Sequence, residues 1–321
     1  MIKRNIGPLL CSVVLLLITL ACGPAPKEYT YSDYLFGSQC SIKFYYIGDE
    51  RADEIIDVID LELTRLDSLL NYFSDQSLVS ELNRKSRVQA PGDIIYLVNV
   101  CDSVSRLTDG LFDITVAPLL EIWGFYHGEK KIPSSDEIAR AKHHVDYRRV
   151  RITADSLIID PGMRVDFGGI AQGYAADRAG LILRQRHVKS AIIDIGGEVL
   201  VIGQSPQLRS WRVGIRNPRG QGIVEAVELQ DSAVSTSGDY EKFFIIGNKR
   251  YPHIINPHTG LPAQGFASVS VFAKTATIAD AMATATAILG PARGIEFLDS
   301  LGFGGIIYYE ENQTLRRVST R

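Results

Sequence analysis

The chain has 321 residues, of which 45% are hydrophobic and 22% are charged, and this composition is that of an ordinary globular protein. Such a chain can bury a sizeable core in one large domain or two smaller ones. The formal net charge is −3 and the sequence has no basic excess, so nucleic acid is not expected as a partner.

The first residues predict export rather than folded structure. A short basic region precedes an apolar run, residues 9–20, that is too short to span a bilayer comfortably. The run ends in T-L-A-C with Cys22, so residues 1–21 resemble the signal peptide of bacterial lipoproteins, whose cysteine is lipidated and becomes the mature N-terminus. A plain signal peptide that is cleaved elsewhere is the alternative. Residues 22–30, which contain prolines, are then expected to form a polar tether.

From residue 31 onward the sequence predicts a mixture of helices and strands. Apolar residues at helical spacing predict a long helix over residues 52–70. Further helices are expected at 77–83, 92–108, 134–142, 170–186, 277–289 and 292–301. Short strands are expected at 41–46, 150–152, 157–159, 191–195, 199–202, 211–215, 224–229, 233–236, 243–246 and 305–309.

This order of elements favours one α+β domain, residues 31–321. Helices and strands do not alternate strictly, and the segment contains no internal repeat or long linker. A mixed, largely antiparallel sheet with packed helices is therefore expected. Cys40 and Cys101 remain in an oxidising compartment and could pair, but the apolar helical surroundings of Cys101 favour a buried thiol.

Several common motifs are missing. G-G-I-A-Q-G at 168–173 is not a dinucleotide-binding G-x-G-x-x-G, because Ile170 stands in the third position. The sequence has no Walker A loop, no H-E-x-x-H and no G-x-S-x-G. Dehydrogenase, P-loop ATPase, zinc protease and ordinary esterase functions are therefore not supported.

A first candidate site is A-D-A-M-A-T, residues 279–284. Asp280 and Thr284 are four residues apart and share one face of the expected helix. A carboxylate and a hydroxyl side by side are hard oxygen ligands that suit Mg²⁺, which keeps waters and takes other ligands from substrate phosphate. Alternatively, Thr284 bonds the carbonyl four residues before it and Asp280 interacts with the helix dipole.

A second candidate is V-D-F-G-G-I-A-Q-G-Y-A-A-D, residues 165–177. A strand enters a Gly-Gly turn and then a helix, whose first N–H groups can bind a pyrophosphate. Asp177 lies within that helix and could reach a ligand hydroxyl or amine. A tight structural turn and a solvated Asp177 are the alternative.

Two further segments carry candidate residues. His253 opens H-I-I-N-P-H-T-G, residues 253–260, and could act as a general base near neutral pH, although a lone histidine is more often structural. Tyr72 lies in the polar loop N-Y-F-S-D and could stack on a flat ligand ring or pack on its own loop. The aromatic residues of segment 108–125 are expected to be core.

The order of these motifs resembles the ApbE family, the FAD:protein FMN transferases. The resemblance covers roughly residues 31–309 and is carried by seven segments in sequence: Y-F-S-D-Q-S-L-V-S-E-L-N, T-D-G-L-F-D-I-T-V-A-P-L, V-D-F-G-G-I-A-Q-G-Y-A-A-D, D-I-G-G-E, S-T-S-G-D-Y, H-I-I-N-P-H-T-G and A-D-A-M-A-T-A. It implies a single ApbE-like (T-fold-like) domain with an FAD site and a magnesium ion beside the pyrophosphate.

The resemblance also implies roles for individual residues. The metal ligands of the family fall on Asp280, on Thr284 and on the backbone carbonyl of Ala171. The proposed catalytic histidine falls on His253. The flavin contacts of the family fall on Phe36, Tyr72, Leu111, Phe112, Asp113 and Asp177.

The chain departs from the family pattern at three places. Phe36 stands where the family has Met. Gln172 replaces the usual Lys and removes a positive charge near the phosphates. The Tyr72 segment has one extra residue and lacks the usual Pro.

The implied reaction transfers FMN from FAD to a threonine or serine hydroxyl of an exported flavoprotein, such as a subunit of a membrane redox complex, and releases AMP. The implied location is the bacterial cell envelope, where a lipid anchor at Cys22 holds the protein on a membrane facing the periplasm. An FAD pyrophosphatase and a non-enzymatic FAD-binding lipoprotein are the alternatives, and Gln172 is the best argument for the second.

Overall fold

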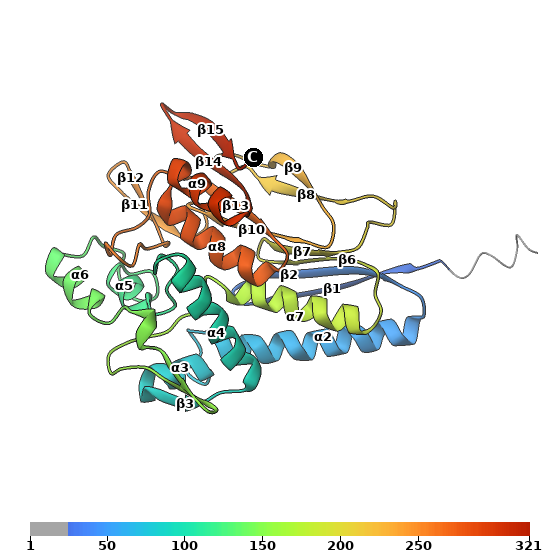
Figure 1. Ribbon diagram of the computed structural model, residues 1–321, viewed down its shortest axis with the longest axis horizontal. Helices are drawn as coiled ribbons and strands as arrows, with labels where there is room; N and C mark the ends of the chain where they lie inside the picture. Colours follow the sequence, from blue (N-terminus) through green and yellow to red (C-terminus); the bar gives the residue numbers. More distant parts are fainter. Residues whose placement is uncertain (1–24) are drawn as a thin grey trace, which may run out of the picture.

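An eight-stranded sheet organises the part of the chain that the computed structural model describes, residues 25–321 (Figure 1). Every neighbouring pair in this sheet is antiparallel, in the order β1-β2-β6-β7-β10-β13-β14-β15. The strands are β1 (Lys27–Leu35), β2 (Ser38–Tyr46), β6 (Ser190–Ile195), β7 (Glu198–Ile202), β10 (Ala233–Gly238), β13 (Ser268–Ala273), β14 (Gly304–Glu311) and β15 (Thr314–Ser319). The predicted α+β class is confirmed, and the predicted signal peptide with Cys22 lies outside the described residues.

The first strand begins earlier than the sequence suggested. β1 pairs with β2 along its whole length, from Lys27 opposite Tyr46 to Leu35 opposite Ser38. Residues 27–30, which were expected in the tether, therefore belong to the sheet. The prediction missed this strand because β1 has one edge on solvent and carries charged and polar residues between its apolar ones, of which only Tyr31 is buried.

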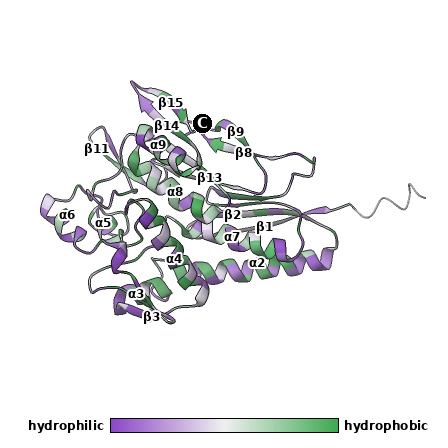
Figure 2. Cartoon of the chain, in the orientation of Figure 1, coloured by the Kyte–Doolittle hydropathy of each residue, from purple (hydrophilic) through white to green (hydrophobic). Residues whose placement is uncertain are grey.

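Four helices cover one face of the sheet (Figure 1). They are α2 (Asp49–Leu70), α7 (Ala171–Gln185), α8 (Ala276–Leu289) and α9 (Pro291–Leu301). In α2 the buried residues recur every three or four positions: Ala52, Ile55, Ile59, Leu63, Leu66 and Leu70. Leu61, on the opposite side of the helix, is 72% exposed. Figure 2 accordingly shows hydrophilic and hydrophobic residues mixed along α2, as expected of an amphipathic helix at the surface.

α8 is buried on nearly all sides. It packs against β10, β13, α7 and α9, and it is rich in alanine. Small side chains let the neighbouring backbones approach closely, and alanine has the best helix propensity. The sequence predicted this helix within one residue at its start.

A hairpin covers the other face of the sheet. β8 (Trp211–Arg216) pairs antiparallel with β9 (Ile223–Leu229), and its apolar side closes a second, smaller core. Val199 and Val234 point into this smaller core, whereas Leu200 and Ala233 point into the main core under the helices. The two faces of β7 and β10 are thus fixed by the alternation of their side chains.

The remaining elements pack at one end of the helical layer. They are α3 (Leu78–Lys85), β3 (Arg87–Gln89), α4 (Gly92–Leu107), α5 (Ala117–Ile122), α6 (Ser135–Lys142), the 3₁₀ helix Tyr147–Arg149, β4 (Arg151–Thr153), β5 (Ser156–Ile158), β11 (Phe243–Ile246) and β12 (Lys249–Pro252). Figure 1 shows α5 and α6 near the β11–β12 hairpin, and Trp123 and Phe244 share a small aromatic core there. No helix within residues 25–321 has the length and hydropathy needed to cross a membrane.

Cys40 and Cys101 are both buried and free. Burial raises the pKa of the Cys40 thiol to about 11 and raises that of Cys101 as well. The expected buried thiol at Cys101 is confirmed, and the alternative disulfide between the two residues is not formed.

Candidate functional site

The elements that carry the predicted metal ligands contact each other where the start of α7 crosses α8. The backbone N–H of Gly173 donates a hydrogen bond of 3.0 Å to Asp280 Oδ2, although the two residues are 107 positions apart. A Cβ at Gly173 would lie 2.4 Å from the Ala276 carbonyl oxygen and 2.8 Å from Asp280 Cβ. The missing side chain of Gly173 therefore allows the two helices to touch through their backbones.

Asp280 is a buried carboxyl, 5% exposed. Burial raises its pKa to about 7, the hydrogen bond from Gly173 opposes that rise, and the negative charges of Glu241 and Asp177 add to it. The group lies in the second turn of α8, not the first. The alternative of a simple helix-dipole partner is therefore not supported, and an acid held in this environment is poised to pair with a cation.

Thr284 lies one turn further along α8 and faces the Gly-Gly turn before α7. A Cβ at Gly169 would lie 3.2 Å from Thr284 Oγ1 and 3.4 Å from the Phe112 ring. Among the side-chain hydrogen bonds of residues 25–321, none joins Thr284 to the carbonyl of Asp280, whereas Thr108 makes such a bond to Val104. The hydroxyl of Thr284 thus remains available to a ligand.

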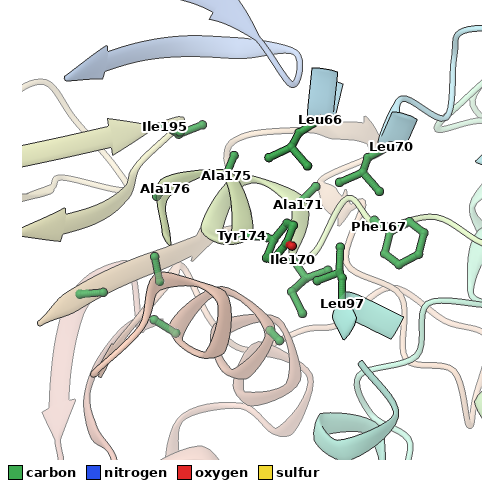
Figure 3. Packing of buried hydrophobic residues seen from close by; sticks show 14 of the residues in the cluster. Leu66, Leu70, Leu97, Phe167, Ile170, Ala171, Tyr174, Ala175, Ala176 and Ile195 are labelled. Carbon is green, nitrogen blue, oxygen red and sulfur yellow. The ribbon is translucent and has the colours of Figure 1, made fainter. Parts of the chain in front are cut away.

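Ala171 is the first residue of α7, and it completes the predicted ligand set. Its N–H donates a hydrogen bond of 2.8 Å to the carbonyl of Phe167, so the chain turns sharply into the helix. Buried side chains anchor this turn: Figure 3 shows Phe167, Ile170 and Ala171 beside Leu66, Leu70 and Leu97. The start of α7 is therefore a rigid platform on which backbone groups keep their positions.

The chemistry of this donor set fits Mg²⁺. A carboxylate, a hydroxyl and a backbone carbonyl are all hard oxygen donors, and Mg²⁺ is usually bound through few protein ligands together with waters and substrate phosphates. Across residues 25–321, no group of three or more His, Cys, Asp or Glu side chains is arranged to hold a metal ion. A site that relied on such a cluster, as zinc sites do, is therefore not present in this part of the chain.

Asp177, a predicted flavin contact, caps α8. Its Oδ1 accepts a 2.9 Å hydrogen bond from Ala276 N, and its Oδ2 accepts one of 2.9 Å from Thr277 N and another from the Thr277 hydroxyl. Burial raises the pKa of Asp177 while these bonds lower it. The alternative of a solvated Asp177 is wrong. Asp177 lies at the N-terminus of α8, the helix of the predicted metal ligands, and contact with FAD stays a prediction.

Tyr72 belongs to an aromatic wall. Its ring lies 4.3 Å from the ring of Tyr126 and 5.5 Å from that of Phe73. The Tyr72 hydroxyl donates a hydrogen bond of 2.6 Å to Glu121 Oε1, and the Tyr126 hydroxyl donates one to Asp166 Oδ2. Phe73 is 54% exposed, so its ring is the part of this wall that is open to solvent. Flat ligands stack on surfaces of this kind.

The loop with Leu111, Phe112 and Asp113 is held by hydrogen bonds to Asp113. The Oδ1 of Asp113 accepts bonds of 2.7 Å from Thr115 N and 2.6 Å from Thr115 Oγ1, and Oδ2 accepts one of 3.0 Å from Tyr147 N. Burial raises the pKa of Asp113 to about 6. Phe112 is 4% exposed and reaches Gly169, so this loop borders the start of α7.

Phe36 lies at the β1–β2 turn with a positive φ of 54°. Its N–H donates a bond of 2.8 Å to Asp67 Oδ1, and its carbonyl accepts one of 3.2 Å from Gln172 Nε2. Gln172 also donates a bond of 3.0 Å to Ser38 Oγ. The amide that stands in place of the usual Lys therefore fastens the β1–β2 turn to the start of α7.

His253 follows β12 and is half-buried. Its Nδ1 lies 3.1 Å from the carbonyl oxygen of Lys242, which can only accept, so Nδ1 carries the proton and Nε2 keeps a free lone pair. Burial, together with the positive charge of Lys242, lowers the pKa of His253 to about 4. The imidazole is therefore neutral at physiological pH and is in the form that can accept a proton.

Charged residues of the hairpin before His253 act on the pKa values of Asp166 and Asp280. Lys242 acts on the pKa of Asp166, which burial raises and Lys242 lowers. The negative charge of Glu241, which lies at the surface, adds to the rise in the pKa of Asp280. The charges of Lys242 and Glu241 thus link the hairpin of His253 with Asp166 of the aromatic wall and with Asp280.

Sequence reasoning missed several members of this region. Tyr126, Glu121 and Asp166 complete the aromatic wall, and Lys242 orients His253. Asp166 stands inside the V-D-F-G-G motif, which was a usable signal. Nothing in the sequence marked Glu121 or Lys242, because their partners are more than ten residues away along the chain.

Comparison with known proteins agrees with this arrangement. The sequence profile of the ApbE family matches residues 36–307. A relative from Treponema pallidum, named FAD:protein FMN transferase, is 30% identical over 313 residues, which are 89% of this chain and 85% of the relative. A relative of the same name from Salmonella typhimurium is 28% identical over 317 residues, which are 92% and 90% of the two chains.

Solved structures give the same result. The apo form of the flavinyl transferase ApbE from Pseudomonas stutzeri superposes with a TM-score of 0.85 at 29% identity and covers 93% of this chain and 96% of its own. An ApbE protein from Thermotoga maritima gives a TM-score of 0.82 at 31% identity and covers 91% and 97% of the two chains.

Proposed function

The chain belongs to the ApbE family and is an FAD:protein FMN transferase, and we propose that Asp280, Thr284 and the Ala171 carbonyl bind the Mg²⁺ for this transfer. The observation that carries the proposal is the contact of α7 with α8, where Gly173 donates to Asp280 and Gly169 lies against Thr284. The proposed ligands are oxygen donors of the kind that Mg²⁺ prefers.

The reaction is a phosphoryl transfer. A hydroxyl of a threonine or serine on the acceptor protein attacks the FMN phosphorus of FAD, the bond between that phosphorus and the bridging oxygen of AMP breaks, and AMP leaves. Bound Mg²⁺ would neutralise charge on the pyrophosphate oxygens. The positive end of the α7 dipole favours anions at the start of this helix.

His253 is the proposed general base. The Lys242 carbonyl fixes its tautomer so that Nε2 presents a lone pair. A hydroxyl is a weak nucleophile at neutral pH, and a neutral imidazole within hydrogen-bond reach removes its proton as the bond to phosphorus forms. The lowered pKa keeps His253 unprotonated before the reaction.

The flavin is proposed to lie against the aromatic wall, with contacts to Phe36, Tyr72, Leu111, Phe112, Asp113 and Asp177. Tyr72 is supported by its place beside Tyr126 and the exposed ring of Phe73. Phe36 is supported by the two hydrogen bonds that fix its turn. Gln172 has a neutral amide, which holds this turn and provides no positive charge for the phosphates. The charge of the phosphates would then be balanced by the metal and by the N-terminus of α7.

Incubation of the purified protein with FAD, Mg²⁺ and candidate exported flavoproteins tests the proposal. Flavin fluorescence on the acceptor band of a denaturing gel, lost when EDTA replaces Mg²⁺, is the expected result. Release of free FMN and AMP without acceptor labelling would identify a pyrophosphatase. Bound FAD that stays uncleaved with Mg²⁺ present would identify a flavin-binding protein that is not an enzyme.

We also propose that the mature protein is a lipoprotein of the bacterial cell envelope that begins at a lipidated Cys22 and faces the periplasm. Support comes from the basic, apolar and T-L-A-C pattern of the first residues. The acceptor would then be an exported flavoprotein, such as a subunit of a membrane redox complex. Mass spectrometry of the protein from the membrane fraction tests this, and an unmodified N-terminus at another residue would contradict it.

A further inference from the structure

Glu198 is a buried acid that the transfer mechanism above does not use. It is the first residue of β7 and is 5% exposed. Its Oε1 accepts a hydrogen bond of 3.1 Å from Ser235 Oγ, whereas its Oε2 is buried and has no hydrogen-bond partner. A buried carboxylate with one unpaired oxygen is costly, so its presence calls for a compensating partner.

The strand register places this side chain on the side of the metal ligands. β7 pairs with β10 through Leu200 opposite Ala233, two residues that point into the main core beneath the helices. Glu198 is two positions before Leu200, so it points to the same face of the sheet. α8 packs on both strands, and after burial the negative charge of Asp280 is the largest cause that raises the pKa of Glu198.

The turn before Glu198 also touches the start of α7. A Cβ at Gly196 would lie 2.7 Å from Gln172 Nε2 and 2.7 Å from Ser38 Oγ. Gln172 directly follows Ala171, the residue whose carbonyl is a proposed ligand. The turn that leads into Glu198 thus contacts the start of α7, and α8, which carries Asp280, packs on the strand of Glu198.

We propose that Glu198 is a positioning residue of the metal site, whose free Oε2 accepts a hydrogen bond from a metal-bound water beneath Asp280. The inference rests on the proposed function. Asp280 contributes a single negative charge to a divalent cation, and Thr284 is neutral, so a second buried carboxylate nearby strengthens binding by its charge. Because Mg²⁺ keeps several of its waters, an acid can act on it through water without becoming a direct ligand.

The substitution Glu198→Gln tests this role. It keeps the shape of the side chain and an oxygen for Ser235, but it removes the negative charge. Mn²⁺ binding, followed by the loss of the free-ion signal in electron paramagnetic resonance, reads out the metal site without turnover. We expect affinity to fall about 10–100-fold, the usual effect of removing an outer-shell partner. Unfolding in metal-free buffer should show unchanged or higher stability, because an unpaired buried charge has been removed.

Glu241→Gln is the matched control. Glu241 also adds to the negative field at Asp280, but its side chain is exposed. Its loss should change Mn²⁺ affinity by less than about threefold, as solvent screens exposed charges. Ser235→Ala, which frees Glu198 from its only hydrogen bond, should weaken Mn²⁺ binding by an intermediate factor and provides a second test if Glu198→Gln does not fold.

Mn²⁺ binding to Glu198→Gln with wild-type affinity would overturn the inference while leaving the ligands of α8 in place. An equal loss in Glu198→Gln and Glu241→Gln would also overturn it, because the effect would then be one of general charge. Failure of the wild-type protein to bind Mn²⁺ would instead overturn the metal assignment itself, and this inference with it.

Discussion

The substitution Gly173→Ala should damage both the fold and the metal site, because α7 and α8 touch through their backbones at this residue. The added methyl would lie 2.4 Å from the Ala276 carbonyl oxygen. Since an ordinary contact is about 3.4 Å, the helices must separate by about 1 Å, and overpacking of this kind costs about 1–3 kcal/mol.

Two further terms set the magnitude. The separation stretches the hydrogen bond from Gly173 N to Asp280 Oδ2, and a hydrogen bond to a charged group contributes about 1.5–3 kcal/mol. Alanine has a higher helix propensity than glycine, which stabilises the folded state by about 1 kcal/mol and offsets part of this loss. The expected loss in the free energy of unfolding is therefore about 1.5–5 kcal/mol, with a value near the middle if the hydrogen bond is only partly lost.

Urea unfolding followed by circular dichroism gives the change in stability, and Mn²⁺ titration gives the change at the site. Gly180→Ala on the same helix is the control. There a Cβ would meet the end of the Leu200 side chain, at 2.5 Å, which can rotate away, so the loss should be about 1 kcal/mol or less. Metal affinity should fall in Gly173→Ala and stay near wild type in Gly180→Ala. Equal stability and equal metal affinity of the two variants would refute the reasoning from the backbone contact.

Four other predictions concern the site and the residues around it. Asp280→Ala should nearly abolish transfer while circular dichroism stays native, and Thr284→Ala should lose less because a neutral ligand adds less to metal affinity; full Mg²⁺-dependent activity of Asp280→Ala would contradict the metal assignment. His253→Ala should slow single-turnover transfer about 10²–10⁴-fold with little change in the dissociation constant of FAD. The pKa of His253 is lowered from 6.5 to about 4 in the folded protein, so the unfolded chain takes up this proton at a higher pH than the folded one does. The free energy of unfolding should therefore be unaffected by His253 above pH 6.5 and should fall as pH drops from 6.5 towards 4. The transfer rate of the wild type should accordingly show no titration of His253 between pH 6 and 8. A change in the rate near pH 6.5 that is absent from His253→Ala would contradict this, because it would show that the imidazole is solvated. Asp177→Ala should destabilise the protein by about 2 kcal/mol in urea unfolding, because the N–H groups of Ala276 and Thr277 at the start of α8 lose their acceptor, and unchanged stability would contradict this role.

Local patterns were enough to predict most helices and strands. The buried stripe of α2 repeats every three or four residues, and the alanine run of α8 ends at Gly290. Both signals lie within one element and can be read without knowing any neighbour. β1 was missed, and short elements such as α5, β3, β12 and β15 were not predicted, because segments of this length carry little periodicity of their own.

The candidate site was predicted through the order of its motifs rather than from the chemistry of single residues. Asp280 and Thr284 on one helix face gave only a weak signal by spacing. The seven motifs in order pointed to the ApbE family, and the match over residues 36–307 confirms that identification. Roles for Phe36, Tyr72 and His253 came from the same resemblance, and they remain predictions.

Only the tertiary structure decided how these residues act on one another. Asp177 binds the N-terminus of α8 99 residues away, and Gln172 fastens the turn of Phe36 136 residues away. Glu198 is buried with one carboxylate oxygen, Oε2, that has no hydrogen-bond partner. Contacts of this kind join separate elements whose relative positions are set by the packing of the whole core. A sequence records each partner by itself, but the distance between two partners exists only after the chain has folded, so their shared chemistry has no local pattern to reveal it.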